Sequence, residues 1–440
     1  MTEIEINEES TGFRAVLAHR DFTLLWSGQL VSNIGTAIAS LALMFYAFDL
    51  TGSAMAMAIL AIAQTLPVVA FAGPIGVYID QWNRKNIMVV SDVVRAITIL
   101  LVPLTAYFPP FVPTIYWVYI LTFLYATANA WFFPARSASI PNLVEGDELV
   151  AANSLSQMTF QVVQLIVPPV GGILVALLAP DYFLAFAINS VTFILSAFAL
   201  RSIITNLTPS RDVEDKESLM IQIKQGARYV IGNSILSFLF VFAMLLAVSS
   251  GILNALFMPY LEGELSLGSS QIGLILSAGA ASGAATAIYF SRKKELDRPL
   301  YLVAGAGFLA GVAVFALFLA FDLMTVMLSW AMIGAVDVIL NIPLTVLMQQ
   351  LVEDELRGRV FALLNVAFTA IQVVGMGIGG VWAEVAASTG PPVISAGVAL
   401  VLVSLLGFVV IAKLNLHAGL SRPASEESEI SQELVVEVPA

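Results

Sequence analysis

The chain has 440 residues, of which 59% are hydrophobic and only 11% are charged. Soluble domains usually carry about 25% charged residues, so this composition excludes an ordinary water-soluble globular protein. The net charge is −12 and cysteine is absent, which excludes disulfide-stabilised folds and thiol chemistry.

The N-terminal segment, residues 1–24, is polar and begins MTEIEINEES. It has neither the basic start nor the apolar run of a cleavable signal peptide, so the first helix is expected to direct insertion. A hydrocarbon core about 30 Å thick needs about 20 apolar residues per helix. In the first half of the chain we predict spans at 25–48, 54–79, 87–107, 114–134, 151–178 and 183–200.

A polar stretch at 204–228 is predicted to be a cytoplasmic linker. The second half then repeats the pattern, with spans predicted at 229–259, 271–290, 300–321, 324–347, 360–384 and 393–412. The chain ends in a glutamate-rich tail at 414–440, which we expect to be solvated. The predicted fold class is therefore an all-α membrane protein with 12 transmembrane helices in two six-helix bundles, at 25–203 and 229–413.

Lysine and arginine cluster in alternate gaps between the apolar segments. The clusters are Arg14 and Arg20; Arg84, Lys85 and Arg95; Arg136; Arg201, Arg211, Lys216, Lys224 and Arg228; Arg292, Lys293, Lys294 and Arg298; Arg357 and Arg359; and Lys413 and Arg422. Short basic loops stay in the cytoplasm, so both termini are expected there, with the protein in the bacterial inner membrane.

The two halves share an internal repeat. A shift of the chain by 208 positions places Leu143-Val144-Glu145 over Leu351-Val352-Glu353, and also matches Gly171-Gly172 with Gly379-Gly380. The two bundles are therefore expected to be pseudo-symmetric. Two such bundles typically place a substrate site between them near the midplane, exposed alternately to each side, which indicates a secondary transporter.

Other functional classes lack their signatures. The chain has no phosphate-binding G-x-x-x-x-G-K-[ST] loop, no HExxH metal motif and no nucleophile elbow. ATP-driven transport by this chain and catalysis are therefore disfavoured, and we expect no cofactor, no metal and no nucleic-acid partner. The expected partners are a small-molecule substrate, protons and membrane lipids, with the protein acting as a monomer.

The loop after the second predicted span reads Gly76-Val-Tyr-Ile-Asp80-Gln-Trp-Asn-Arg84-Lys85. It resembles the G-x-x-x-D-[RK]-x-G-[RK]-[RK] signature of the major facilitator superfamily, with Gln81 and Asn83 as departures. Further segments are similar to the macrolide-efflux and siderophore-exporter branch of that superfamily: FRAVLAHRDFTLLWSGQLVSNIG, FPARSASIPNLVEGDELVAANSL and ELRGRVFALLN.

The resemblance implies the twelve-helix fold and a gating role for Asp80, Gly76, Arg84 and Lys85. Asp80 would then face the amino end of the eleventh helix near Arg359 in the outward-open state. The alternative is an ordinary basic cytoplasmic loop.

Exporters of the superfamily often carry a G-P-x-x-G-G element in the fifth helix. The matching residues are Pro168, Gly171 and Gly172 in the fifth predicted span and Gly375, Gly379 and Gly380 in the eleventh. Small residues permit close helix contact, and proline frees a backbone carbonyl and can bend a helix. Both helices are therefore expected to pivot during transport.

Three charged positions stand out within the predicted spans. Asp92 and Arg95 are three residues apart and can pair on one helix face, as a structural cytoplasmic pair or, alternatively, a coupling pair. Arg136 lies toward the same end and is grouped with them. Asp337 lies midway along the tenth span without a basic neighbour, so it is expected to line water, find a partner or carry a proton. A protonated acid bonded to a neighbouring helix is the alternative to proton coupling.

Neutral polar residues within the spans are candidates for the substrate cavity. They are Asn33, Gln29, Gln64, Asn129 and Asn254. Interhelical hydrogen bonds would explain them equally well. The predicted function is export of a small amphipathic compound (a drug, macrolide or siderophore) by proton antiport. An importer and a non-transporting membrane sensor or scaffold are the alternatives.

Overall fold

The computed structural model describes residues 12–107, 112–179, 181–209, 219–293, 296–320 and 322–414. Its α-helices in the first half are α1 (Phe13–Ala18), α2 (Arg20–Thr51), α3 (Ala54–Ala70), α4 (Ala72–Ile79), α5 (Arg84–Leu101), α6 (Thr114–Ser139), α7 (Leu149–Leu178) and α8 (Phe183–Arg201). Those of the second half are α9 (Leu219–Gly232), α10 (Ser234–Met258), α11 (Ser269–Ser291), α12 (Pro299–Phe318), α13 (Leu323–Leu351), α14 (Asp354–Ala386) and α15 (Gly390–Lys413). The described residues contain no strand.

Ten of these helices are individually long and apolar enough to cross a membrane, and α3 with α4 makes an eleventh span bent by 49°. The bend is explained by Pro74, which has no N–H to donate to the carbonyl of Ala70 and whose ring crowds that carbonyl. Of the three helices left, α1 and α9 are short, whereas α5 has 18 residues, is too charged to qualify on composition and packs against both α6 and α8. With α5 the bundle has the twelve expected spans.

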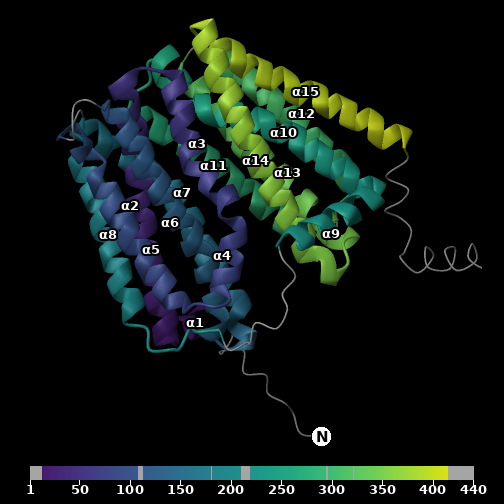
Figure 1. The fold of residues 1–440 in the computed structure, drawn as a ribbon. Helices are drawn as coiled ribbons and strands as arrows, with labels where there is room; N and C mark the ends of the chain where they lie inside the picture. The colour runs from purple at the N-terminus through teal and green to yellow at the C-terminus, as the bar shows by residue number, and fades with distance from the viewer. Residues whose placement is uncertain are drawn as a thin grey trace, which may run out of the picture.

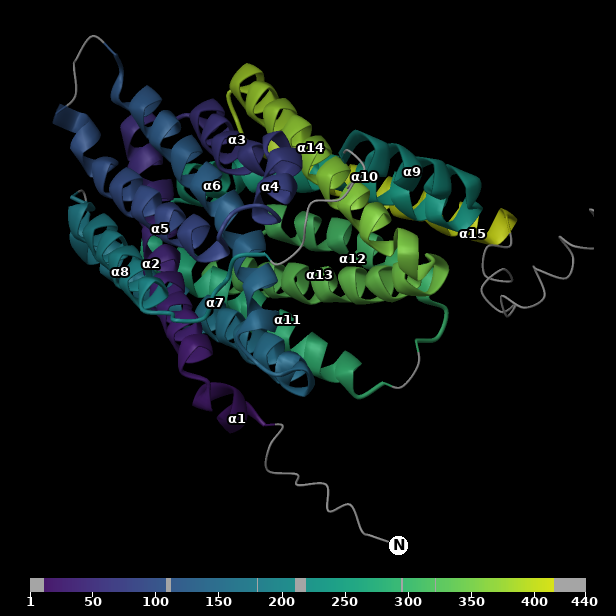
Figure 2. The same cartoon turned by 60° about the horizontal axis from the view of Figure 1, so that its bottom comes forward.

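The helices gather into two groups that follow chain order. Helix α2 packs on α7 and α8, and α5 packs on α6 and α8, whereas α12 packs on α13 and α15, and α10 packs on α14. Figures 1 and 2 show α2 to α8 on one side of the molecule and α10 and α12 to α15 on the other. The most extensive contacts between the groups are those of α7 with α11 and of α3 with α14, and α10 also contacts α3.

The two groups approach each other at one end of the molecule and diverge at the other. The diverging end lies at the bottom of Figure 1, where α1, α4 and α9 are found. Glycines allow the close approach at the other end. A Cβ on Gly172 of α7 would lie 2.4 Å from the carbonyl oxygen of Ser269, and one on Gly273 of α11 would lie 2.3 Å from that of Pro168. The backbones of α7 and α11 therefore touch directly.

The two ends of the bundle differ in their polar chemistry. At the diverging end, Lys85 Nζ donates to the carbonyl of Ile203 at 3.1 Å after the last turn of α8. At the meeting end, Glu264 accepts a hydrogen bond from the backbone N–H of Thr389 at 2.6 Å, and Tyr182 donates to Asp49 at 2.6 Å. Carboxylates thus anchor helix ends at the meeting end, whereas at the diverging end Lys85 does so together with Asp21, which accepts from the backbone N–H of Thr205 at 2.7 Å.

The outward faces of the helices are apolar. Large side chains remain exposed along the spans, among them Leu177 at 77%, Leu328 at 63% and Val385 at 82% exposure. Such a surface would cause aggregation in water, whereas it is compatible with the hydrocarbon core of a membrane. The buried core instead runs between helices, with Phe186, Phe193 and others fully enclosed.

Several boundaries differ from those expected from the sequence. Helix α6 continues through Pro134 to Ser139, and α7 and α14 run without interruption past the glycines expected to bend them. The seventh span begins at Ser234 rather than 229, because Asn233 caps α10 through its side-chain oxygen. Residues 1–11, 210–218 and 415–440, including both acidic tails and part of the predicted linker, lie outside the described residues.

Replacing Gly172 with Ala is predicted to destabilise this conformation by about 1–3 kcal/mol, because the new methyl group meets backbone that has to move. Thermal unfolding in detergent measures the effect. The matched control is Gly377→Ala, since a Cβ on Gly377 meets nothing within 4 Å. Equal midpoints for the two variants would contradict the close contact between α7 and α11.

Candidate functional site

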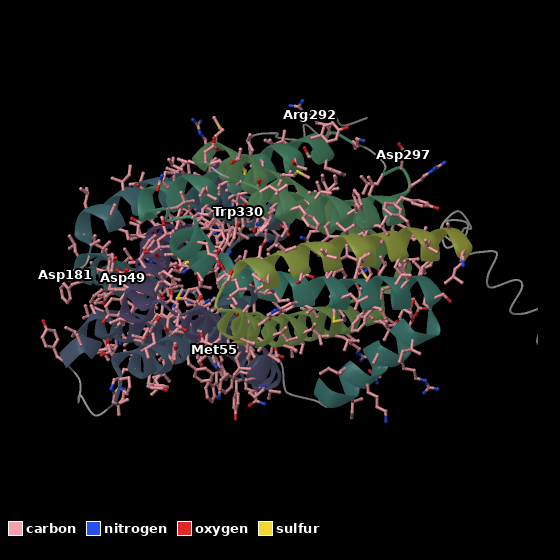
Figure 3. The ribbon with its side chains drawn as sticks, turned by 90° about the horizontal axis from the view of Figure 1, so that it is seen from above. Asp49, Met55, Asp181, Arg292, Asp297 and Trp330 are labelled. Carbon is pink, nitrogen blue, oxygen red and sulfur yellow. The ribbon has the colours of Figure 1, made fainter. Side chains whose placement is uncertain are left out.

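A cavity of about 720 Å³ lies between the two groups of helices. Its wall comes mainly from α10 to α15, and residues of α2 and α3 complete it from the other group. Figure 3, which views the molecule from the meeting end, places the lining residue Trp330 near the middle and Arg292 and Asp297 at the edge. Pockets that bind drug-sized ligands span about 300–1,000 Å³, so the cavity has room for a whole small molecule.

One face of α13 supplies the most informative part of the wall. Trp330, Ile333, Asp337, Leu340 and Leu344 recur at spacings of three and four residues and all line the cavity. The Asp337 side chain is exposed to this space although it lies in the middle of an apolar span. Within the part of the chain that the structure describes, Asp337 is the one charged side chain in the lining.

The nearest partner of Asp337 is neutral. Asn341, one helical turn later, donates its amide to Asp337 Oδ1 at 3.0 Å and to the Asp337 carbonyl at 2.9 Å. No lysine or arginine among the described residues forms an ion pair with Asp337. A carboxylate in this position is therefore stabilised by one amide and by the open space of the cavity, not by a buried cation.

Apolar and aromatic groups form most of the remaining wall. Phe257 of α10 packs on Trp330 of α13 with ring centroids 4.4 Å apart. The exposed amides of Gln64 and Asn254 enter the cavity from α3 and α10. Ser250, also in the lining, accepts a hydrogen bond from Gln372 of α14 at 3.0 Å. The arrangement suits a ligand with a large apolar body and few polar groups.

Asp92 and Arg95 of α5 form a buried ion pair, with 0% and 5% exposure. Arg95 also donates to Asn129 Oδ1 at 3.1 Å, and its guanidinium lies 4.1 Å from the ring centroid of Phe132 and 4.4 Å from that of Phe193. The cation is thus held between two aromatic faces and one carboxylate. Asn129 is occupied by this network and does not line the large cavity.

The motif loop after α4 is tied to neighbouring helix ends. Arg84 donates to the Ala138 carbonyl at 2.7 Å and to Asn142 at 3.0 Å, near the end of α6. Gly76 lies inside α4, where a Cβ would meet nothing within 4 Å. Asp80 follows the last residue of α4. These positions place the loop at the diverging end of the molecule.

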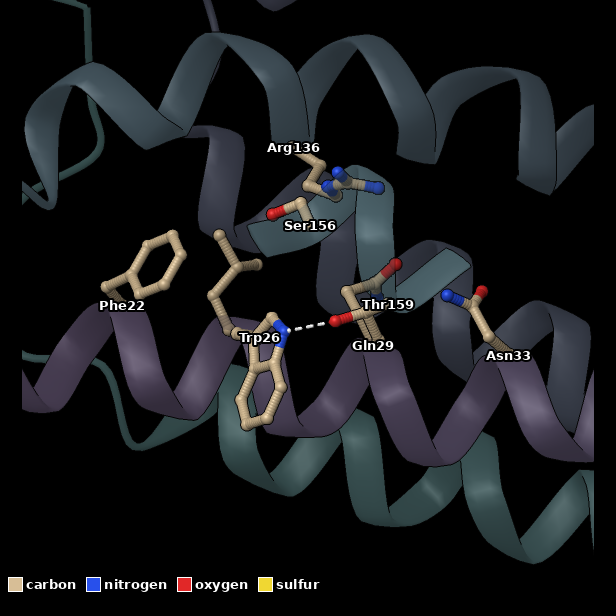
Figure 4. Close-up of a pocket in the computed structure, with 8 residues that line it drawn as sticks. Phe22, Trp26, Gln29, Asn33, Arg136, Ser156 and Thr159 are labelled. Atoms are coloured by element: carbon tan, nitrogen blue, oxygen red, sulfur yellow. Dashed lines mark hydrogen bonds between the residues drawn. The ribbon is translucent and has the colours of Figure 1, made fainter. Parts of the chain in front are cut away.

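A second, much smaller pocket of about 10 Å³ lies between α2, α6 and α7. Gln29 and Asn33 of α2, Arg136 of α6 and Ser156 and Thr159 of α7 line it, as Figure 4 shows. The sequence groups Arg136 with Asp92 and Arg95. In the structure Arg136 lies in this small pocket instead, apart from that ion pair. That expectation differs from the structure because Arg136 lies on another helix and its guanidinium faces α2 and α7.

The glycines expected to act as pivots all lie at helix contacts. A Cβ on Gly375 would lie 2.2 Å from the carbonyl oxygen of Val248 in α10, and one on Gly379 would lie 3.1 Å from Ile252 Cα. Gly380 faces Ala58 of α3 and Gly171 faces Ile38 of α2. Pro168 supplies the carbonyl that Gly273 approaches.

Two features of the site were missed from the sequence. The pairing of Asn341 with Asp337 could have been found, because residues four apart face each other on a helix. The division of the polar candidates between two separate pockets had no signal in the sequence.

Among the described residues, no group of three or more His, Cys, Asp or Glu side chains could hold a metal ion.

Arg95→Leu is predicted to lower the free energy of unfolding by about 3–5 kcal/mol, because it leaves the fully buried Asp92 without its cation. Thermal unfolding of the purified protein gives the comparison. Adding Asp92→Asn to Arg95→Leu should restore part of the loss. Arg201→Leu, at the exposed end of α8, is the control, and a loss as small as that of the control would refute a structural role for the pair.

Comparisons with known proteins agree with this architecture. The family model described as Major Facilitator Superfamily matches residues 25–376. The uncharacterised MFS-type transporter YfiS of Bacillus subtilis is 27% identical over 389 residues, which cover 82% of this chain and 86% of that protein. Macrolide efflux protein A of Streptococcus pyogenes is 31% identical over 153 residues, or 35% of this chain and 37% of that one.

The enterobactin exporter EntS of Salmonella typhimurium is 25% identical, covering 77% of this chain and 80% of its own. Among solved structures, a point mutant of the nucleoside transporter NupG superposes with a TM-score of 0.72 at 12% identity, covering 88% of this chain and 99% of that chain. This likeness supports the fold. The bundle of apolar helices, the family match and the relatives together show that the chain is a membrane transporter and belongs to the major facilitator superfamily.

Proposed function

We propose that the protein exports a small amphipathic compound from the cytoplasm by alternating access, in exchange for protons. The observation that carries this proposal is the unpaired carboxylate of Asp337 in an apolar cavity of about 720 Å³. Macrolide efflux protein A and the enterobactin exporter, both relatives of this chain, support export of such compounds.

The proposed orientation follows from charge. The diverging end carries Arg84 and Lys85, whereas the meeting end is anchored by Glu264 and Asp49. Because basic loops remain in the cytoplasm, we assign the diverging end to the cytoplasm and both termini with it. In this conformation the two groups of helices are closed toward the outside, and the cargo enters from within the cell.

The proposed coupling uses the two protonation states of Asp337. With the meeting end open, a proton from outside neutralises the carboxylate and lowers the cost of a charge in an apolar chamber. With the diverging end open, the proton leaves to the cytoplasm and the cargo binds. Asn341 holds the carboxylate in place in either state through its amide.

The proposed conformational parts lie at the two ends. Separation of α7 from α11 at Gly172, and of α3 from α14 at Gly380, would open the outer end. Closure of the cytoplasmic end would bring Asp80 toward the amino end of α14, where a carboxylate gains about 0.3–1 kcal/mol from the helix dipole. We propose that one chain, surrounded by lipid, performs this cycle.

Asp337→Asn is predicted to abolish transport driven by a pH gradient while leaving the fold intact, because asparagine keeps the shape and cannot release a proton. The assay uses purified protein in liposomes, an imposed pH gradient and a panel containing a macrolide, a siderophore and naphthylacetate. Asp322→Asn is the matched control, since Asp322 is an exposed cap at the end of the same helix and asparagine caps equally well.

Proton-driven flux at the wild-type rate in Asp337→Asn would remove this residue from the coupling step. No gradient-driven movement of any panel member by the wild-type protein would refute coupled export. Binding without movement would favour a sensor, and uptake in the direction of the proton flow would favour an importer.

A further inference from the structure

The small pocket beside α2 contains a cation without an anion. Arg136 is partly buried near the end of α6, and among the described residues the one interaction of its guanidinium is with the Phe133 ring, whose centroid lies 5.8 Å away. None of the described residues that line the pocket is a carboxylate. A guanidinium presents five N–H donors in a fixed fork that fits planar oxyanions. The donors of Arg136 are therefore available to a bound group.

The neighbouring side chains add donors and no competing charge. Gln29 is 8% exposed, and its Nε2 is buried without a hydrogen-bond acceptor. Asn33 lies one helical turn further along the same face of α2. Thr159 accepts from Trp26 Nε1 at 2.9 Å and donates to the Leu155 carbonyl at 2.7 Å, so its hydroxyl is already used. Buried donors without acceptors are costly, and an acceptor in this pocket would satisfy them.

The pocket is too small to hold a whole solute. At about 10 Å³ it accommodates little more than a water-sized group in this conformation. However, the face of α2 that carries Gln29 and Asn33 continues to Ser40 and Met44, which line the large cavity. At 1.5 Å per residue, Asn33 and Ser40 are separated by roughly 10 Å along the helix. An elongated molecule can therefore reach both places.

We propose that Arg136, assisted by the amides of Gln29 and Asn33, binds the anionic head group of the transported compound. The substrate class is then amphipathic organic anions, which carry a carboxylate or a similar oxyanion at one end and an apolar body at the other. The head group lies in the small pocket and the body extends along α2 into the large cavity. This inference rests on the proposed function and narrows its substrate class.

The test measures binding by the full-length protein in nanodiscs of zwitterionic lipid. Three probes share one aromatic ring and differ in charge: naphthylacetate is an anion, naphthylacetamide is neutral and naphthylethylamine is a cation. We expect naphthylacetate to bind the wild-type protein at least about tenfold more tightly than naphthylacetamide, which is the size of effect that one charge-assisted hydrogen bond produces. The cation should bind most weakly.

Arg136→Gln should remove the preference for the anion while retaining the affinity for naphthylacetamide, which also reports that the variant is folded. Arg136→Lys should keep a reduced preference, because the charge remains and the planar fork is lost. Arg201→Gln, which removes an exposed arginine far along α8, is the matched control and should bind all three probes as the wild type does.

An undiminished anion preference in Arg136→Gln, or no anion-selective binding by the wild type, would overturn the proposal. A repeat in nanodiscs with anionic lipid separates substrate from lipid. Loss of naphthylacetate binding there would assign the pocket to a lipid head group and also overturn it. Anion-selective binding without proton-driven transport would instead refute the proposed export, so the two failures are distinguishable.

Discussion

A charged side chain inside the hydrocarbon layer has to find a partner, reach water or lose its charge, because the layer itself solvates it poorly. This constraint separates the intramembrane charges into two kinds. Asp92 and Arg95 form an ion pair, and the Arg95 guanidinium lies over the rings of Phe132 and Phe193, so each charge has a partner. Asp337 and Arg136 have no such partner among the described residues, and each faces a cavity.

The contacts between the two groups of helices follow from a second constraint, the small size of glycine. Gly172 and Gly273 let the backbones of α7 and α11 touch, and Gly380 lets α14 approach the Ala58 side chain of α3. In lipid there is little hydrophobic force between helices, so close packing of this kind supplies much of the attraction. Contacts made of backbone have few side-chain adjustments available, which favours two discrete arrangements over a continuous range.

Much of the fold could be predicted from the sequence, because apolar runs of about 20 residues have few alternatives in a membrane. The third span, predicted at 87–107, overlaps α5 at Arg84–Leu101, although the charges of α5 exclude this helix from a test of composition. The break at Phe71 and the start of α10 after Asn233 depended on local proline and capping chemistry. Such chemistry shifts boundaries without changing the number of spans.

The site was less predictable. Asp337 could be singled out because it has no basic neighbour in sequence, which is a local property. The location of Arg136 was a matter of which helices pack together, since α6 turns that side chain toward α2 and α7 rather than toward α5. The position of Asn129 likewise depends on helix packing. Asn129 of α6 accepts a hydrogen bond from Arg95 of α5 and does not line the large cavity.

We propose that the transport cycle depends on one step, in which the unpaired carboxylate of Asp337 exchanges a proton when cargo occupies the cavity. The most direct measurement is the release of protons when the neutral naphthylacetamide, which adds no like charge beside Asp337, is added to the purified protein in weakly buffered solution. We expect release by the wild-type protein and none by Asp337→Asn at equal occupancy. Equal release by both proteins would contradict it.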